Sequence, residues 1–235
     1  MFAMCVAAIA WSAHPRWQLV VAGNRDEFHA RPTAALARWD EGLLAGRDLE
    51  AGGTWMGIAP GRFALVTNRR AEGWPRPGMA SRGGLVSGWL LGEEPAQMAA
   101  MNPFNLFLAD QDQARMLSNF PEQSHDVPRG SLLSLSNSDL AERWFKAGRI
   151  ESGLMTWLGG EEDPEALLAA LADEVRDPAD PDAIHSSVFI RNPTYGTRAS
   201  SVIAIDQAGR GVFIERSFDA EGEETGTVRL EFDWS

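Results

Sequence analysis

Cysteine, lysine and long apolar runs are scarce in this 235-residue sequence. The single cysteine excludes an internal disulfide and suits a reducing compartment, so we expect a cytoplasmic protein. No apolar run reaches about 18 residues, the length that a membrane-spanning helix needs, so we do not expect an integral membrane protein. The apolar start of the chain lacks a basic flank, which argues against a signal peptide.

Positive charge is also in short supply. The net charge is −12 and the isoelectric point is about 4.8. Such a surface repels phosphate backbones, so we expect no binding of nucleic acid. Lys146 is the only lysine, an imbalance that is consistent with genome composition. The four histidines lack metal-ligand spacing and no glycine-rich phosphate loop occurs, so we expect no metal and no resident cofactor.

The residues that are present indicate one folded domain over residues 1–235. Apolar residues make up 44% of the chain, which is enough for a sizeable core. Helices are expected at 34–40, 81–90, 94–101, 139–147 and 164–176. Strands are expected at 4–11, 17–22, 54–59, 62–67, 104–109, 114–118, 131–135, 187–191, 201–206, 211–216 and 225–232. Strand-rich halves that flank helices predict an α+β fold with helices packed outside two sheets.

Cys5 stands at the head of the first apolar run. This run and the next are separated by a short polar segment that contains a His-Pro pair, which predicts an antiparallel hairpin. The hairpin would bring Asn24-Arg25-Asp26-Glu27 back to the start of the first strand, beside the thiol. A free thiol has a pKa of about 8.5, so a nucleophilic cysteine needs a base or a nearby positive charge.

A cysteine at the very start of a chain supplies its own base, because an α-amino group has a pKa of about 8. This mechanism requires that residues 1–4 are absent. We expect Met4 to be the natural start, since Met1-Phe2 is a poor site for methionine removal whereas a small cysteine permits it. The alternative is that Cys5 is a small buried apolar residue, the commoner role of a lone cysteine on an apolar strand.

Short polar signatures occur at four expected strand ends, at 24–27, 67–69, 136–137 and 195–198. Each alone is typical of a turn, because asparagine and glycine tolerate turn backbones. Together with Cys5 they supply what amide hydrolysis requires. Asparagine amides donate to a developing oxyanion, and arginines hold a thiolate or a carboxylate.

These signatures belong to an ordered series of motifs that runs from Met4 to about Glu215. The series is Asn24-Arg25-Asp26-Glu27, Arg31-Pro32-Thr33, Gly46-Arg47-Asp48, Gly52-Gly53-Thr54-Trp55, Thr67-Asn68-Arg69, Ser81-Arg82-Gly83, Phe104-Asn105-Leu106, Leu135-Ser136-Asn137 and Tyr195-Gly196-Thr197-Arg198. It resembles the NRDE family, also called the transport and Golgi organisation protein 2 family. The motif layout is in turn similar to N-terminal nucleophile (Ntn) hydrolases of the choloylglycine hydrolase and penicillin V acylase type. That resemblance implies a four-layer αββα sandwich and a cysteine amidohydrolase or acyl transferase for a small acylated compound.

The resemblance also implies a role for each of six residues. Cys5 would be the nucleophile, Arg25 would lie beside the thiol, Asp26 would orient the amine, Asn68 and Asn137 would bind the oxyanion, and Arg198 would complete the polar floor. One feature departs from the hydrolase pattern, whose arginine stands three residues before the aspartate, where this chain has Gly23. Adjacent strand residues point to opposite faces, so Arg25 and Asp26 are not both expected to face the thiol.

A second function follows from the same resemblance. Members of this family are associated with haem handling and with acyl-CoA lipid metabolism, which implies, as an alternative, a non-catalytic carrier of haem or acyl-CoA on the same fold. A membrane-trafficking scaffold, which the family name suggests, finds no coiled coil or basic amphipathic helix in the sequence to support it.

Overall fold

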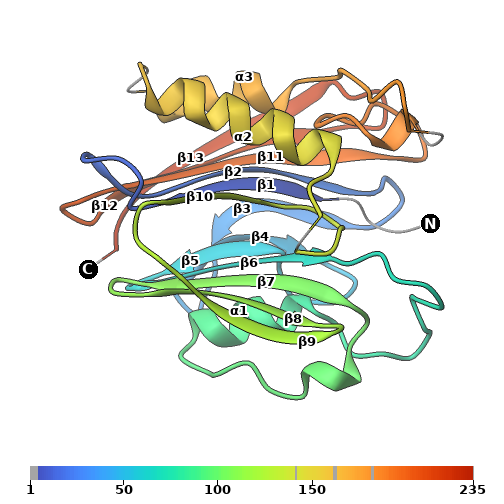
Figure 1. Ribbon diagram of the computed structural model, residues 1–235, viewed down its shortest axis with the longest axis horizontal. Coiled ribbons are helices and arrows are strands. Elements are labelled where there is room, and N and C mark those ends of the chain that lie inside the picture. Colours follow the sequence, from blue (N-terminus) through green and yellow to red (C-terminus); the bar gives the residue numbers. More distant parts are fainter. Residues whose placement is uncertain (1–4, 141, 161–162, 181–182, 235) are drawn as a thin grey trace.

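Two antiparallel sheets lie face to face in the computed structural model, which describes residues 5–140, 142–160, 163–180 and 183–234 (Figure 1). The first sheet has the order β10 (Ser131–Leu135), β1 (Val6–Trp11), β2 (Trp17–Phe28), β11 (Tyr195–Asp206), β12 (Arg210–Phe218) and β13 (Glu224–Asp233). The second has the order β3 (Thr33–Arg38), β4 (Leu44–Asp48), β5 (Met56–Ala59), β6 (Arg62–Asn68), β7 (Phe104–Asp110), β8 (Ala114–Asn119) and β9 (Glu122–Val127). The expected start of the chain at Met4 concerns residues outside the described part.

β1 is buried on both of its faces, because it lies in the interior of the first sheet between two other layers. Its odd-numbered residues, 7, 9 and 11, pack into the core between the sheets. Its even-numbered residues, 6, 8 and 10, pack against helices. The register between β1 and β2 pairs Val6 with Asn24, which confirms the predicted hairpin and places residue 5 beside residues 25 and 26.

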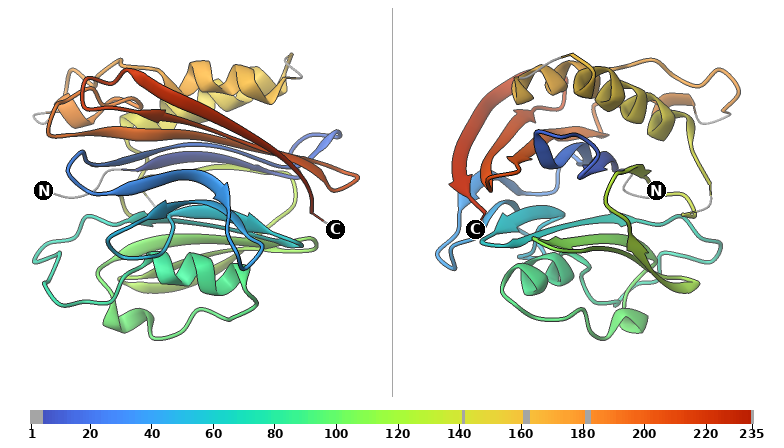
Figure 2. Two further views of the ribbon diagram at one scale, coloured as in Figure 1. Left: turned by 180° about the vertical axis from the view of Figure 1, so that it is seen from behind. Right: turned by 60° about the vertical axis from the view of Figure 1, so that its left-hand side comes forward.

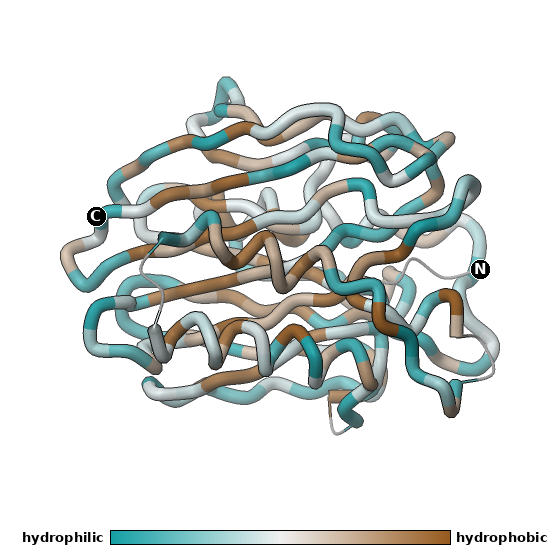
Figure 3. Tube along the Cα trace, turned by 90° about the horizontal axis from the view of Figure 1, so that it is seen from above, coloured by the Kyte–Doolittle hydropathy of each residue, from teal (hydrophilic) through white to brown (hydrophobic). Residues whose placement is uncertain are grey.

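Helices form the two outer layers. α2 (Phe145–Leu158) and the short α3 (Leu168–Leu171) cover the outer face of the first sheet, and α1 (Gly83–Leu90) covers the second (Figures 1 and 2). Hydrophobic residues concentrate along the middle of the strands, and hydrophilic residues gather in the loops at their ends (Figure 3). The predicted α+β fold of two antiparallel sheets covered by helices is therefore confirmed.

Several expected elements differ from those in the structure. The segment expected as a helix at 34–40 is β3, because it pairs with β4 and buries Leu36 in the core between the sheets. The helix at 94–101 is reduced to one 3₁₀ turn, Met98–Ala100, and the helix at 164–176 is a 3₁₀ turn followed by α3, which ends at Leu171. α2 begins at Phe145, later than expected. No strand forms at 187–191, whereas β4 and β9 were not predicted.

Candidate functional site

Cys5 lines a cavity of about 320 Å³ to which both sheets and the start of α1 contribute. The residue immediately precedes β1 and is 6% exposed. Its thiol donates a long hydrogen bond, 4.0 Å, to the backbone carbonyl of Asp26. Of the other predicted site residues, Arg25, Asp26 and Asn68 line the same cavity. The structure therefore brings together four of the six.

Arg25 and Asp26 point to opposite faces of β2, as strand alternation requires. Arg25 points toward the second sheet, where its guanidinium donates to Thr33 Oγ1 at 3.1 Å and to Asp48 Oδ2 at 3.3 Å. Asp26 points toward the helix layer, where its Oδ1 accepts a hydrogen bond of 2.7 Å from Thr197. Cys5 thus has a paired arginine on one side of β2 and a buried carboxylate on the other.

Lys146 provides the counter-charge of Asp26. Its Nζ lies 3.6 Å from Asp26 Oδ2, and the two side chains are 1% and 0% exposed. Burial raises the pKa of Asp26, an effect that the Lys146 charge opposes, and burial lowers the pKa of Lys146. Lys146 lies in the first turn of α2, at the positive end of the helix dipole, where a cation is disfavoured. The position is therefore costly for a lysine, and its contact with Asp26 offsets part of the cost.

The thiol of Cys5 is held in its protonated form in this arrangement. Burial, followed by the charge of Asp26, raises the pKa of Cys5 to about 12. Arg25 and Lys146 act in the opposite direction but do not overcome the burial. With an amide bond on its nitrogen, Cys5 is therefore a thiol and not a thiolate at neutral pH.

Asn68 and Asn137 occupy different positions relative to the cavity. Asn68 ends β6 and lines the cavity. Asn137 follows β10, is fully buried, and donates from Nδ2 to the backbone carbonyl of Asn68 at 2.6 Å. It is not among the residues that line the Cys5 cavity. Of the two asparagines, Asn68 is therefore the one that lines the Cys5 cavity, and Asn137 supports the backbone that carries it.

Arg198 fixes the turn that follows β2. Its Nη1 donates to the carbonyls of Phe28, His29 and Arg31, each at 3.1 Å. The residue stands at a break in the register between β11 and β2 and lines a neighbouring chamber, not the Cys5 cavity. Its contacts in the described structure thus hold the backbone that carries Arg31.

Acidic and basic side chains alternate along the wall of the Cys5 cavity. Asp48 Oδ2 lies 3.3 Å from Arg25 and 2.7 Å from Arg31, and Glu27 lies 4.0 Å and 3.9 Å from the same two arginines. These contacts hold the pKa of the Asp48 carboxyl below its usual value against the opposing effect of burial. The cluster keeps Arg25 and Arg31 in fixed positions.

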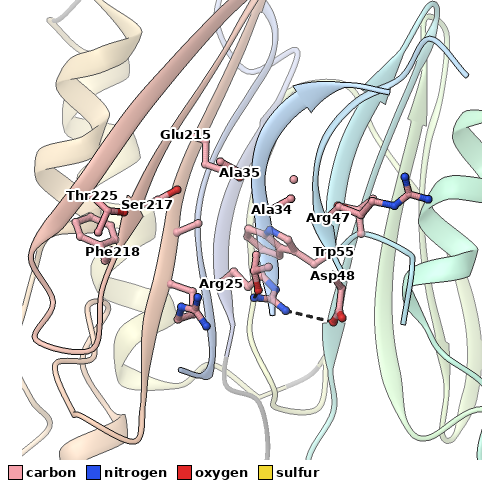
Figure 4. Close-up of a pocket in the computed structure, with 15 residues that line it drawn as sticks. Arg25, Ala34, Ala35, Arg47, Asp48, Trp55, Glu215, Ser217, Phe218 and Thr225 are labelled. Atoms are coloured by element: carbon pink, nitrogen blue, oxygen red, sulfur yellow. Dashed lines mark hydrogen bonds and ion pairs between the residues drawn. The ribbon is translucent and has the colours of Figure 1, made fainter. Parts of the chain in front are cut away.

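A second chamber of about 230 Å³ adjoins the cavity and shares Arg25, Asp48, Thr54 and Trp55 with it. Figure 4 shows Arg25 directed at Asp48, with Glu215 on the side of the first sheet. Glu215 is 4% exposed and accepts hydrogen bonds from the Leu36 backbone at 2.6 Å and from Ser201 at 3.4 Å. Glu215 thus links β12 of the first sheet to β3 of the second.

Replacing Glu215 by glutamine should make the stability of the protein less dependent on pH. Burial raises the pKa of Glu215 from 4.5 to about 7. A carboxyl whose pKa is raised on folding stabilises the protein below the unfolded pKa, and this contribution is lost as the pH rises through the folded pKa. Between pH 5 and pH 8, wild type should lose about 2–3 kcal/mol of unfolding free energy relative to Glu215→Gln, measured by urea titration.

Glu231→Gln, at an exposed position of β13, is the matched control and should leave the pH dependence as it is in wild type. If the difference between wild type and Glu215→Gln stays constant from pH 5 to pH 8, Glu215 does not titrate in that range and its link to β3 does not depend on charge.

Sequence reasoning assigned no role to three residues of the site, Lys146, Glu215 and Arg82. Arg82 and Glu215 fall within the span of the motif series, but no role was attached to either. The signal for Lys146 was its being the only lysine of the chain, which composition alone appeared to explain. Arg82 immediately precedes α1, whose first residue is Gly83. The backbone of Gly83 packs closely on Gly53, and a Cβ added to Gly53 would lie 2.6 Å from the carbonyl carbon of Gly83. Gly53 therefore allows the start of α1 to lie against this loop at the wall of the cavity.

The described ranges contain no group of three or more His, Cys, Asp or Glu side chains arranged to hold a metal ion. Within the same ranges, no helix is long and apolar enough to cross a bilayer.

The fold and the site define a class of protein: a four-layer sandwich with a cysteine at the head of an interior strand, beside a buried aspartate and a strand-end asparagine. A family model described as Transport and Golgi organisation 2 matches residues 4–220, and the chain belongs to this family. The resemblance in the motifs is thereby confirmed.

Relatives from three animals match over most of their length. The Transport and Golgi organization protein 2 homolog of Homo sapiens is 29% identical, with 91% of this chain and 93% of the relative covered. The homolog of Bos taurus is 31% identical with the same coverage of 91% and 93%. Transport and Golgi organization protein 2 of Drosophila melanogaster is 27% identical, with 94% of this chain and 95% of the relative covered.

Proposed function

We propose that the protein is an N-terminal cysteine amidohydrolase or acyl transferase that acts on a small acylated compound through an acyl-enzyme. The observation that carries the proposal is the placement of Cys5, Asp26 and Asn68 around one cavity. A cavity of about 320 Å³ suits a small molecule. The resemblance to Ntn hydrolases in motif layout supports the same reaction class.

In the proposed reaction the Cys5 thiolate attacks the amide carbonyl carbon, and Asn68 donates to the oxyanion that forms. The C–N bond then breaks, and the leaving amine takes the proton that the thiol gave to the Cys5 amine. Water, or a second nucleophile in the transferase case, cleaves the acyl thioester and regenerates the thiol. Asp26 orients the amine, and Lys146 keeps the Asp26 carboxylate paired.

Activation of the thiol depends on the amine in this proposal. With a preceding residue, the nitrogen of Cys5 is an amide and the pKa of the thiol is about 12. A free amine next to the thiol supplies a base with a pKa of about 8. The chain that begins at Cys5 is therefore the active form.

Incubating the chain that begins at Cys5 with a panel of N-acyl amides and thioesters should give an acyl adduct on Cys5 by intact mass and peptide mapping. The chain that begins at Met1 should acylate at least 10²-fold more slowly, because its thiol lacks a base. Protein purified from its native host should have a mass that corresponds to a start at Cys5.

Cys5→Ala should abolish the adduct, and Cys5→Ser should weaken it. Equal acylation of the two chain forms would remove the terminal amine from the mechanism. The absence of an adduct with every donor, in a chain shown to begin at Cys5, would refute the enzymatic proposal.

A non-catalytic carrier of haem or acyl-CoA is the second candidate function. The observation that favours it is the buried, protonated thiol in the chain that carries residues 1–4. A carrier should show saturable binding of haem, seen as a Soret shift, or of acyl-CoA, with no adduct on Cys5. Titrating both chain forms with each ligand separates the two functions.

A further inference from the structure

Arg82 is a cation of the Cys5 cavity without a carboxylate partner. It lines the cavity together with Cys5 and also lines the adjoining recess of about 170 Å³ that extends to Trp74. Its side chain is partly buried, and among the described residues its guanidinium makes one hydrogen bond, from Nη1 to the carbonyl of Pro103 at 3.2 Å. It forms no ion pair with a described carboxylate; burial lowers its pKa, an effect that the charges of Cys5 and Glu27 oppose. The remaining guanidinium donors are therefore available to a group inside the cavity.

The other charges of the cavity are balanced. Arg25 and Arg31 share Asp48 and Glu27. Asp26 is paired with Lys146 on the far side of β2. Arg31 also pairs with Glu50, at 3.2 Å, which lies outside the cavity lining. Among the residues that line the cavity, Arg82 is the cation that forms no ion pair with a described carboxylate. A desolvated charge without a partner is unfavourable, so a bound anion would stabilise it.

We propose that Arg82 binds an anionic group of the ligand, so that the substrate of the Cys5 site is an acyl compound with a carboxylate or a phosphate. This inference rests on the proposed function, since it names the substrate class of the same site. Arg82 and Cys5 line the same cavity of about 320 Å³. The anionic group therefore lies close to the reacting thiol. Arginine suits this role because its planar donors match both kinds of oxyanion.

Alkylation of Cys5 by two reagents that differ only in charge tests the anion site without requiring hydrolysis. Iodoacetate carries a carboxylate where iodoacetamide carries a neutral amide; in each case the S–C bond forms, iodide leaves, and the thiol proton passes to the buffer. For the chain that begins at Cys5, the ratio of the iodoacetate rate to the iodoacetamide rate should fall about tenfold in Arg82→Gln, since a hydrogen bond to a charged group contributes roughly tenfold or more.

Arg82→Lys retains the charge and should recover part of the ratio, which also guards against a folding defect in Arg82→Gln. Arg47→Gln is the matched control, because Arg47 lines the neighbouring chamber but not the Cys5 cavity. An unchanged ratio in Arg82→Gln would overturn the proposal. If the ratio is unchanged because both rates fall equally, Arg82 stabilises the thiolate and not a ligand anion.

Acyl donors then identify the source of the anion. One arm compares an N-acyl amino acid with its carboxamide, and the other compares a phosphopantetheine thioester with its dephosphorylated form. The anionic member of at least one pair should acylate Cys5 about tenfold faster, and Arg82→Gln should remove that preference. If no donor forms an adduct while the alkylation ratio behaves as expected, the hydrolase proposal fails and the anion site stands. If adducts form without any preference for charge, the anion site fails and the hydrolase proposal stands.

Discussion

Replacing Asn68 by alanine should slow the acylation of Cys5 by about 10²–10³-fold, the effect of removing one oxyanion donor. Asn68, at the end of β6, lines the Cys5 cavity, and the other described asparagine that lines it, Asn102, donates its amide to the backbone of Arg76. The measurement is the rate of adduct formation by rapid-quench mass spectrometry, with donor in excess. Thermal unfolding of the variant should stay close to wild type, since Asn68 is only partly buried.

Asn102→Ala is the control for this variant, because Asn102 lines the same cavity but its side-chain amide is hydrogen-bonded to the backbone of Arg76. It should change the acylation rate by less than about threefold. Asn137→Ala should also slow acylation, by loosening the Asn68 carbonyl that Asn137 holds, and it should lower stability because Asn137 is fully buried. An Asn68→Ala rate within threefold of wild type would exclude Asn68 as an oxyanion donor.

The strands that form the walls of the site were readable from the sequence because their periodicity is local. Buried interior strands appear as continuous apolar runs, as in β1, and the polar residues that end β2 and β6 mark the end of the sheets where the cavity lies. The opposite directions of Arg25 and Asp26 also follow from strand geometry alone. Cys5, Arg25 and Asp26 could therefore be placed near one another before any contact was known, whereas Asn68 joined them through the family resemblance.

Helix and strand were confused where the local signal was weak. The segment 33–38 contains three alanines and no strict alternation, so its pairing with β4 and the Glu215 contact to Leu36 determine its conformation. These interactions come from distant parts of the chain. Tertiary contacts thus override local propensity here.

The ion pairs between layers could not be predicted from the sequence either. Lys146 reaches Asp26 only because α2 packs on the outer face of β1 and β2. Arg198 shows the reverse case: its motif suggested a place in the polar floor, whereas the register break in β11 directs it to the backbone after β2. Residue types can be matched to a chemistry from sequence, but their partners depend on how the layers pack.

Replacing Lys146 by methionine should lower the free energy of unfolding at pH 8 by about 3–5 kcal/mol, because the change leaves a buried carboxylate without its partner. Lys146 and Asp26 are 1% and 0% exposed. The pKa of Asp26 is already raised by burial, and loss of the lysine raises it further. In Lys146→Met, Asp26 is neutral at low pH, and the variant loses stability as the pH rises through the folded pKa of Asp26. The loss of unfolding free energy caused by Lys146→Met should therefore be smaller at pH 5 than at pH 8.

Two further variants separate the effect of the Asp26–Lys146 ion pair from a general effect of substitutions in α2. Arg149→Gln removes a partly exposed ion pair with Asp173 from the same helix and should cost less than about 1 kcal/mol. The double variant Asp26→Asn/Lys146→Met removes both buried charges and should recover most of the stability, since an uncharged pair of similar size needs no desolvation of ions. A Lys146→Met cost below 1 kcal/mol at pH 8 would mean that Asp26 is not charged in the folded protein.

The double variant also distinguishes stability from catalysis. It should fold as well as wild type, yet it lacks the carboxylate that orients the Cys5 amine in the proposed mechanism, so acylation should remain slow in a stable protein. A buried ion pair contributes little net stability compared with neutral residues, so the double variant tests the effect of the pair on Cys5 apart from its effect on folding. If the double variant acylates Cys5 at the rate of wild type, the pair serves only the packing of α2 on the first sheet, and the role of Asp26 in the proposed mechanism is lost.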